Sequence, residues 1–334
     1  MSNDAVIVDR VQAPIYVRGE RFPVESNAGR ALEHVERSGL VALTGITGAH
    51  ARIVAPDSDK IWDWFTARTG IYNVTDHKGR FGRKGAKVNV VAHGLGHPLS
   101  RSKRVSEALV TTYTEETGTA QLSEEEENEL LSDEGTPLFA YDAFLEASTD
   151  PKFVRAHPSL RIVRTQDVLS RTRHGPQALS ALYDNSSVLV YVGGRTPVQV
   201  ITPEGEEKTV TVAQALVDRT GQRFKRTEAG VGLHGTDGGR VLFVDGDDNG
   251  LHGDSDLDDS ARFVGVGAKW QLPLAQEAQP LCAGGASEDS PRSGDAPERV
   301  IVPNLEQVLA LGRERIAPAL WNDFEAGARK LYQN

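Results

Sequence analysis

The segment of the chain best suited to chemistry is the acidic stretch 244–256. It contains the run Asp-x-Asp-x-Asn-Gly at 245–250, with oxygen-bearing side chains at alternate positions. Alternate positions bring these oxygens to one side, and the glycine permits the tight turn that a small hard cation requires. The sequence therefore predicts a divalent-cation loop of the calcium kind, with Ca²⁺ as the bound ion. The predicted metal ligands are Asp245, Asp247, Asn249, Asp254 and Asp256.

This run resembles the first half of an EF-hand loop. Asp256 stands at the twelfth position, where an EF-hand carries a bidentate glutamate, and its shorter side chain departs from that pattern. The flanks 240–244 and 262–266 are typical of strands, so the resemblance is to calcium loops carried by β scaffolds. Seven aspartates lie between 245 and 259 without a Lys or Arg, and they repel one another unless a cation or neighbouring arginines neutralise them. The alternative is an exposed loop closed by its own hydrogen bonds.

Two histidines four positions apart form the second candidate site, His93-Gly94-Leu95-Gly96-His97. The spacing resembles the H-E-x-x-H helix of zinc peptidases, which places both imidazoles on one face. Here glycine replaces the glutamate base, and two glycines followed by a proline oppose a helix. One interpretation is a glycine-rich loop after a strand, with histidines that face solvent. The other is an alternative function, a metal-dependent hydrolase that holds Zn²⁺ with His77, His93 and His97 and uses a glutamate of the acidic block as general base.

Charged residues form two adjacent blocks of opposite sign. Residues 78–104 carry eight basic side chains and no acidic one, and residues 105–150 carry thirteen acidic side chains and no Lys or Arg. The blocks either neutralise each other on one chain, where exposed ion pairs contribute about 0–1 kcal/mol each, or the basic block meets an anionic partner. A neighbouring copy's acidic block would be such a partner, and the copies would stack head to tail. An anion-binding module based on the basic block is a second alternative function.

Composition narrows the class of protein. The 334 residues are 39% hydrophobic and 25% charged, enough for a substantial core, and the net charge of −10 argues against a dedicated nucleic-acid binder. No apolar run approaches the roughly 20 residues that cross a bilayer, and the N-terminus lacks the pattern of a secretory signal. The single cysteine, Cys282, excludes an internal disulfide. We therefore expect a soluble protein, cytoplasmic or part of a particle assembled inside the cell.

Helices and strands must alternate along the chain to position these segments. We expect helices at 26–37, 57–65, 102–115, 140–147 and 212–219, and one that begins at Ser123 with a capping box to Glu126 and the glutamate run 124–127. We expect strands at 5–8, 15–17, 40–43, 87–92, 187–192, 198–202, 208–212, 240–244 and 262–266. The Val-Gly-Gly-Arg run at 192–195 is either an ordinary turn or an anion-binding one.

The predicted fold class is α+β, with mixed helices and mainly antiparallel strands, two subdomains, an extended N-terminal arm and a long C-terminal helix. The predicted divisions are a mixed subdomain at 1–150, a β-rich subdomain at 151–279, a flexible linker at 280–299 and a helix at 300–334. Because no catalytic constellation stands out, we expect a non-enzymatic structural or assembly protein. Its expected partners are further copies of itself or other protein subunits.

Overall fold

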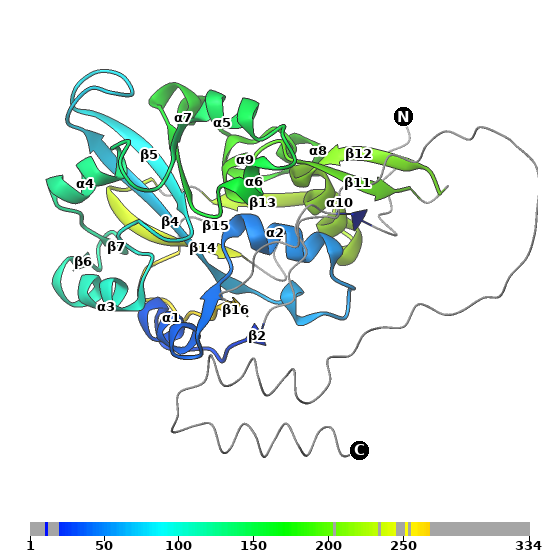
Figure 1. Cartoon of the computed structure of the whole chain (residues 1–334), viewed down its shortest axis with the longest axis horizontal. Helices are drawn as coiled ribbons and strands as arrows, with labels where there is room; N and C mark the ends of the chain where they lie inside the picture. Colours follow the sequence, from blue (N-terminus) through cyan, green and yellow to red (C-terminus); the bar gives the residue numbers. More distant parts are fainter. Residues whose placement is uncertain are drawn as a thin grey trace, which may run out of the picture. The chain divides into compact units, whose positions relative to one another are not determined.

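A long β hairpin forms the centre of the fold. Its strands, β4 (Phe65–Asp76) and β5 (Ala86–His93), pair antiparallel along the whole of β5. β14 (Gly238–Val244) pairs with the other side of β4, and β9 (Leu160–Arg164) pairs with the other side of β5. Strands from distant parts of the chain therefore flank the hairpin (Figure 1).

The computed structural model describes residues 11–12, 20–202, 205–232, 235–244, 251–252 and 255–267. Within these residues the main sheet has ten strands in the order β10-β13-β15-β14-β4-β5-β9-β8, with β6 and β7 joined through β14. All pairs are antiparallel except β13 with β15 and β8 with β9. The other strands of this sheet are β6 (Tyr113–Thr114), β7 (Thr119–Ala120), β8 (Leu138–Ala140), β10 (Gly175–Ala178), β13 (Glu228–Gly232) and β15 (Leu251–His252).

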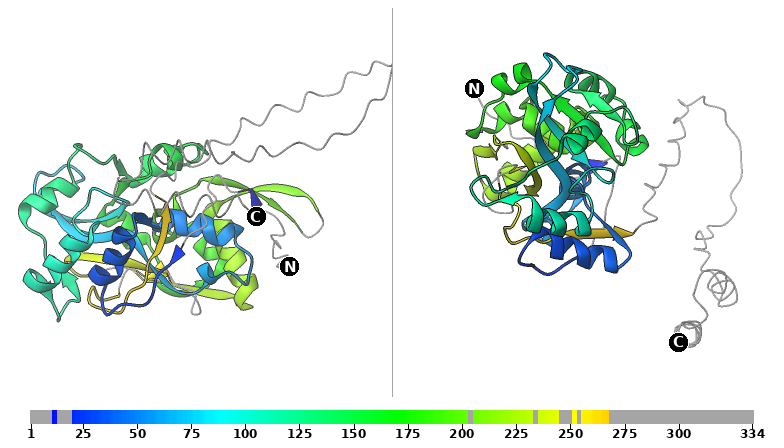
Figure 2. Two further views of the ribbon diagram at one scale, coloured as in Figure 1. Left: turned by 60° about the horizontal axis from the view of Figure 1, so that its bottom comes forward. Right: turned by 90° about the vertical axis from the view of Figure 1, so that its left-hand side faces the viewer.

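Two three-stranded sheets accompany the main one, in the orders β1-β11-β12 and β2-β16-β3. Their strands are β1 (Val11–Gln12), β2 (Glu20–Arg21), β3 (Leu40–Ala42), β11 (Pro197–Ile201), β12 (Glu207–Thr211) and β16 (Val264–Gly267). The described helices are α1 (Ala28–Arg37), α2 (Gly45–Val54), the 3₁₀ turn η1 (Lys60–Trp62), α3 (Ser102–Thr111), α4 (Glu124–Leu130), α5 (Tyr141–Ala147), α6 (Phe153–Ala156), α7 (Gln166–Arg171), α8 (Leu179–Leu182), α9 (Ser186–Val192) and α10 (Val212–Phe224). Helices lie on both faces of the main sheet (Figure 2).

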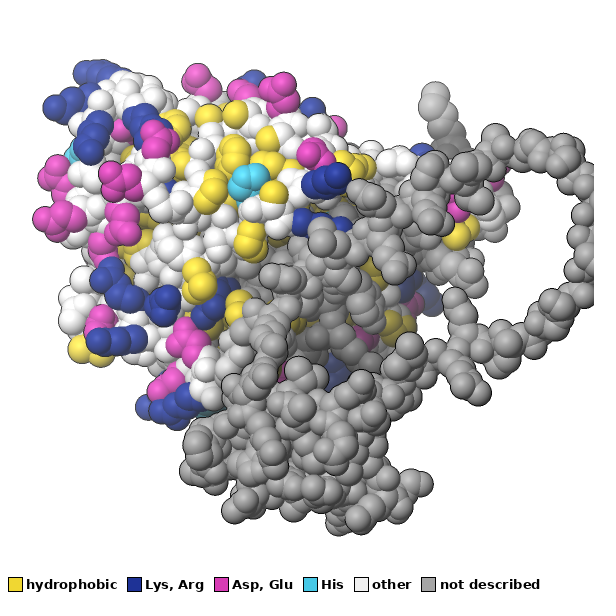
Figure 3. All heavy atoms as spheres, viewed as in Figure 1, with side chains coloured by type: hydrophobic (Ala, Val, Ile, Leu, Met, Phe, Trp, Pro, Cys, Tyr) yellow, Lys and Arg dark blue, Asp and Glu magenta, His cyan; other side chains and the backbone are white. Residues whose placement is uncertain are grey.

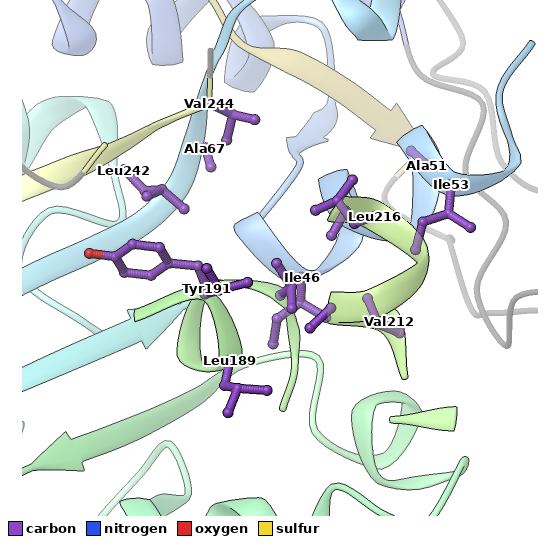
Figure 4. Close-up of a cluster of buried hydrophobic side chains, with 14 of the residues drawn as sticks. Ile46, Ala51, Ile53, Ala67, Leu189, Tyr191, Val212, Leu216, Leu242 and Val244 are labelled. Carbon is purple, nitrogen blue, oxygen red and sulfur yellow. The ribbon is translucent and has the colours of Figure 1, made fainter. Parts of the chain in front are cut away.

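The main sheet buries both of its faces, so it has two hydrophobic cores. Along β4, Ile71 belongs to one core and its neighbour Tyr72 to the other, because successive side chains of a strand point to opposite faces. Helices α2, α9 and α10 cover the first face, where Ile46 lies between Tyr191 and Val212 (Figure 4). Helices α1 and α3 pack together over the second face.

The α+β class with mainly antiparallel strands is confirmed. The predicted helix at 26–37 is α1, which Asn27 caps by accepting a hydrogen bond from the Arg30 amide. The predicted capping box is present at the start of α4, where Ser123 and Glu126 satisfy each other's backbone N–H groups. The predicted strands at 87–92 and 240–244 are β5 and β14.

Two predicted elements are wrong. The valine-rich run predicted as a strand at 187–192 is the helix α9, in which every residue is buried. Asn185 caps its start, and Gly193 ends it in the left-handed conformation with φ of 100°. The predicted helix at 57–65 is only the short turn η1, and β4 begins at Phe65. In α9, burial on all sides removed the polar alternation that separates strand from helix.

The main sheet draws strands from both sides of residue 150, since β4 and β5 precede that position and β9 and β14 follow it. The predicted subdomains 1–150 and 151–279 thus share one sheet. The chain divides into two compact units between Gln279 and Pro280. Most of the predicted N-terminal arm, the linker 280–299 and the helix 300–334 lie outside the described residues. No helix among the described residues is long and apolar enough to cross a membrane.

Candidate functional site

His93 is a buried link between four elements rather than a solvent-facing ligand. Its side chain is 1% exposed, and its Nε2 donates to the carbonyl of Val190, 2.8 Å away. Because a carbonyl only accepts, Nδ1 is the acceptor for the hydroxyl of Thr69 at 3.0 Å, and Thr69 in turn accepts from the Gly45 amide. Burial is the main cause of the low pKa of His93, which is about 4. The imidazole is therefore neutral and ties β4 and β5 to α2 and α9.

The other two histidines of the hydrolase hypothesis have different partners. Nδ1 of His97 lies 2.5 Å from the hydroxyl of Tyr72, and that hydroxyl also accepts from the Leu99 amide. Burial lowers the pKa of His97 to about 3. Nε2 of His77 lies 2.6 Å from a carboxylate oxygen of Glu127 on α4. Both residues thus hold secondary structure elements together.

The 93–97 segment is a loop, as the two glycines indicated. Gly94 and Gly96 have φ of 80° and 86°, values that a helix does not contain. In the described part of the chain, no group of three or more His, Cys, Asp or Glu side chains could hold a metal ion. The zinc-hydrolase alternative therefore has no assembled centre among the described residues, although its residues are all present there.

Of the predicted calcium ligands, only Asp256 lies in the described residues; Asp245, Asp247, Asn249 and Asp254 lie outside them. The Asp256 carboxylate accepts from Nη1 of Arg240 at 3.1 Å. Its neighbours are held similarly, since Asp258 accepts from the Tyr113 hydroxyl and Asp259 from the Asp256 amide. An arginine, a phenol and a backbone amide thus bind the aspartates at this end of the loop. Asp256 fits poorly as a metal ligand, and a calcium ion would depend on the other four residues.

The basic and acidic blocks contact each other within the chain. Arg80 pairs with Asp133, and Arg104 pairs with Glu126. His77, at the edge of the basic block, contacts Glu127. Part of the charge is therefore neutralised across one surface. These ion pairs involve only some of the cations in the basic block.

The loop that joins β4 to β5, residues 77–85 (His-Lys-Gly-Arg-Phe-Gly-Arg-Lys-Gly), is the most basic turn of the described chain; we call it the basic hairpin loop. Asp76, 1% exposed, anchors it, because its carboxylate accepts from the Phe81 amide at 2.6 Å. Burial alone would raise the pKa of Asp76, but hydrogen bonds from the amides of 78–81 outweigh burial and lower the pKa below its ordinary value of 3.8. The loop is thereby fixed in one conformation, with glycines at positive φ at 79, 82 and 85.

Four cations on the basic hairpin loop are exposed, and Arg80 is paired with Asp133, which leaves Lys78, Arg83 and Lys84. In the described part of the chain none of these three has an acidic side chain within ion-pair distance. Figure 3 shows Lys and Arg side chains gathered over the hairpin and acidic side chains directly beside them, over α4. Glu124 and Glu125 are exposed on that helix and have no cationic partner among the described residues. Unneutralised charge of both signs is thus adjacent on one face.

Sequence reasoning found the basic block but missed its anchor. Asp76 is the last acidic residue before the eight basic ones, and an aspartate followed by glycine-rich residues is typical of a turn in which the side chain caps backbone amides. That signal was available in the sequence. The separation of the block into paired residues such as Arg104 and unpaired ones such as Arg83 depends on tertiary contacts, and only the structure shows it.

No protein-family model matches this chain, and no curated protein is significantly similar to it. A solved structure described as "Accommodation of massive sequence variation in Nanoarchaeota by the C-type lectin fold" is similar in fold, with a TM-score of 0.53 and 21% sequence identity. The alignment covers 75% of this chain and 97% of that one. The chain thus has a C-type lectin fold. At this identity the similarity shows the fold alone and specifies neither activity, ligand nor partner.

Proposed function

We propose that this protein is a non-enzymatic interaction protein that binds an acidic protein surface, in the first place that of a second copy, through its basic hairpin loop. The observation that carries the proposal is the set of three exposed cations, Lys78, Arg83 and Lys84, on a loop that Asp76 fixes. A contact surface that is already ordered loses little conformational entropy when it binds. The loop is therefore better suited to recognition than a mobile basic tail.

Residues outside the basic hairpin loop also contact its base. Arg80 donates to the carbonyl of Leu131 at 2.8 Å and stacks over the ring of Phe81 at 5.3 Å. Glu127 accepts from the Thr75 amide and contacts His77. These contacts engage the charged groups near the sheet, so the cations at the tip of the loop can bind a partner.

A second copy suits this surface because the complementary charges lie beside it on the same chain. Glu124 and Glu125 are exposed on α4, the helix that contacts the base of the loop through Glu127 and His77. Two copies can therefore place each hairpin loop against the other's α4, either symmetrically or head to tail. Opposite surfaces of this kind raise the association rate and lose their effect as salt screens them beyond ~8–10 Å.

The similar solved structure supports a recognition role in a general way. It is described as a C-type lectin fold that accommodates massive sequence variation. A scaffold that keeps its core while its surface changes is suited to binding partners rather than to one fixed chemistry. The histidines His93 and His97 are consistent with that division, because both are committed to holding the core.

The test is the oligomeric state measured by sedimentation velocity over a range of salt and protein concentrations. We expect the wild type to associate at low salt and to dissociate as salt increases. The double variant Arg83→Glu/Lys84→Glu should remain monomeric, as should Glu124→Lys/Glu125→Lys. Mixing these two variants should restore association as a heterodimer, because the reversed charges again attract.

The matched control is Arg30→Glu/Lys152→Glu, which changes the net charge by the same amount at exposed positions away from the loop. It should associate like the wild type. A wild type that is monomeric at all salt concentrations would contradict self-association. Equal association of the reversed-charge and control variants would contradict the role of the hairpin loop.

We also propose that a cation bound by Asp245, Asp247, Asn249 and Asp254 stabilises the acidic loop. The support is that β14 and β15 pair on either side of residues 245–250, so the ends of this run are held together. The proposal predicts a higher melting temperature in excess Ca²⁺ than in a chelator, since a ligand that binds only the folded state stabilises it. An Asp245→Asn/Asp247→Asn variant should lose that difference. An equal melting temperature of the wild type in both conditions would refute it.

A further inference from the structure

A cleft of about 480 Å³ lies among helices α5, α7 and α8 and the start of α9, and no residue of the basic hairpin loop lines it. These elements lie together on one side of the fold in Figure 1. Three exposed arginines line it: Arg171 at the end of α7, Arg173 in the next loop and Arg195 after α9. A volume of this size suits a small organic molecule.

The charge of the cleft is positive. Asp142 and Asp184 are the acidic residues of its lining, and the nearest ion pair, Arg195 Nη2 to Asp184 Oδ1, is long at 3.7 Å. Arg171 is held by a bond from its Nε to the carbonyl of Asp167 at 3.0 Å, which leaves its terminal nitrogens for a ligand. Arg173 has no side-chain partner among the described residues. Two guanidinium groups therefore remain largely uncompensated.

A fourth arginine lies beneath the floor of the cleft. Arg164 is fully buried, and its guanidinium donates to the Asn89 side-chain oxygen and to the hydroxyl of Ser187, the latter at 2.7 Å. It also reaches Ser186, which lines the cleft, at 3.4 Å. None of these partners is a carboxylate. Because a buried charge without a counter-charge is unfavourable, its field favours an anion in the space above it.

The remaining walls define the rest of the ligand. Leu145 and Val168 supply apolar surface, and the half-buried Tyr141 supplies an aromatic ring. The Tyr141 hydroxyl has no hydrogen-bond partner among the described residues. Burial raises its pKa, so the phenol stays protonated and can donate to an acceptor. The cleft thus combines cationic donors with a surface for an apolar body.

We infer that this cleft is a binding site for a small organic oxyanion, a molecule with a phosphate or carboxylate group and an apolar body. Guanidinium groups bind such heads through paired hydrogen bonds. The head lies among Arg171, Arg173 and Arg195 above Arg164, and the apolar body lies against Tyr141. This function is separate from that of the basic hairpin loop. It also gives a role to the glycine-rich turn 193–195, which follows α9 and carries Arg195.

The test is titration calorimetry with three probes that share a phenyl group: phenyl phosphate, phenylacetate and the neutral 2-phenylethanol, at constant ionic strength. We expect the anions to bind and the neutral probe not to bind. The comparison of the two anions identifies which head group the site prefers. The double variant Arg171→Gln/Arg195→Gln should weaken anion binding at least tenfold, because each lost charge-assisted contact typically costs about a factor of ten.

The matched control is Arg30→Gln/Arg37→Gln, which removes two exposed arginines of α1, outside the cleft. It should bind both anions like the wild type. Circular dichroism verifies that both double variants are folded. The inference is overturned if neither anion binds, if the neutral probe binds as tightly as the anions, or if the cleft variant and the control bind equally.

Discussion

Replacing Asp76 by Asn tests the anchoring of the basic hairpin loop. The substitution keeps the size of the side chain but removes its charge, and it places an NH₂ group against backbone N–H donors. The structure gives the Asp76 carboxylate a 2.6 Å bond from the Phe81 amide and further bonds from the amides of 78–80. A hydrogen bond to a charged group contributes about 1.5–3 kcal/mol. Because water can reach part of an opened loop, we expect a total loss of about 2–3 kcal/mol.

The assay is urea denaturation at pH 7, which gives the free energy of unfolding of both proteins. Asp150→Asn is the control, because that exposed carboxylate accepts a single backbone bond, from the Lys152 amide at 2.8 Å. It should lose about 0.5 kcal/mol or less. Amide exchange should accelerate at 78–81 in the Asp76 variant only. If Asp76→Asn is no less stable than Asp150→Asn, the reasoning about the loop is refuted.

The same variant has a defined pH dependence. The folded-state pKa of Asp76 lies below its unfolded value of 3.8, so its stabilisation is fully present above pH 3.8 and is lost as the pH falls through the folded-state value. The difference between wild type and Asp76→Asn should therefore be constant from pH 7 to about pH 5 and should shrink in stronger acid. A difference that already shrinks near neutral pH would contradict the assignment to this carboxylate.

Two other substitutions test the core. Gly45→Ala should lower the free energy of unfolding by about 2–3 kcal/mol in the same denaturation assay, because the added methyl group would lie 2.5 Å from the Tyr191 carbonyl oxygen. Gly267→Ala is the control: its added methyl group has no atom within 4 Å, so stability should change by less than about 0.5 kcal/mol. His50 is fully buried, both of its ring nitrogens lack partners among the described residues, and burial lowers its pKa to about 3. The imidazole therefore takes up a proton when the protein unfolds below pH 6.5, which destabilises the wild type as the pH falls. Relative to the wild type, the free energy of unfolding of His50→Leu should rise by about 1.4 kcal/mol for each pH unit from 6.5 down towards 4. Parallel pH profiles of the two proteins would refute that account.

Much of the fold could be predicted from local signals. A capping residue at 26 or 27 before an apolar stripe predicted α1, and Ser123 with Glu126 predicted α4, because capping uses residues that are close in sequence. The helix α9 could not be predicted in this way. Its run of Val and Leu is typical of a buried strand, and only enclosure by other elements favours the helix. β4 was missed for a related reason, since Arg68, Gly70 and Asn73 interrupt its apolar pattern while both of its faces are covered.

The candidate site could be predicted only in part. The composition of 78–104 indicated a basic block, and in the structure Lys78, Arg83 and Lys84 of that block are exposed. The cleft had no comparable signal, because Arg171 and Arg195 are distant in sequence and line one cleft only through tertiary packing. The prediction for His93 and His97 depended on their spacing, which cannot distinguish ligands from buried core histidines.

The pairing of β4 with β14 has a consequence for how the chain must fold. Asn73 pairs with Gly238, which is 165 positions later (238 minus 73). Contacts so distant in sequence form late and slow folding, because closing the long intervening loop costs conformational entropy before the contacts contribute stability. Until residue 238 leaves the ribosome, β4 presents twelve residues of open edge. An unpaired strand edge is a template for aggregation, so the late pairing of β14 also protects the folded chain from edge-to-edge association.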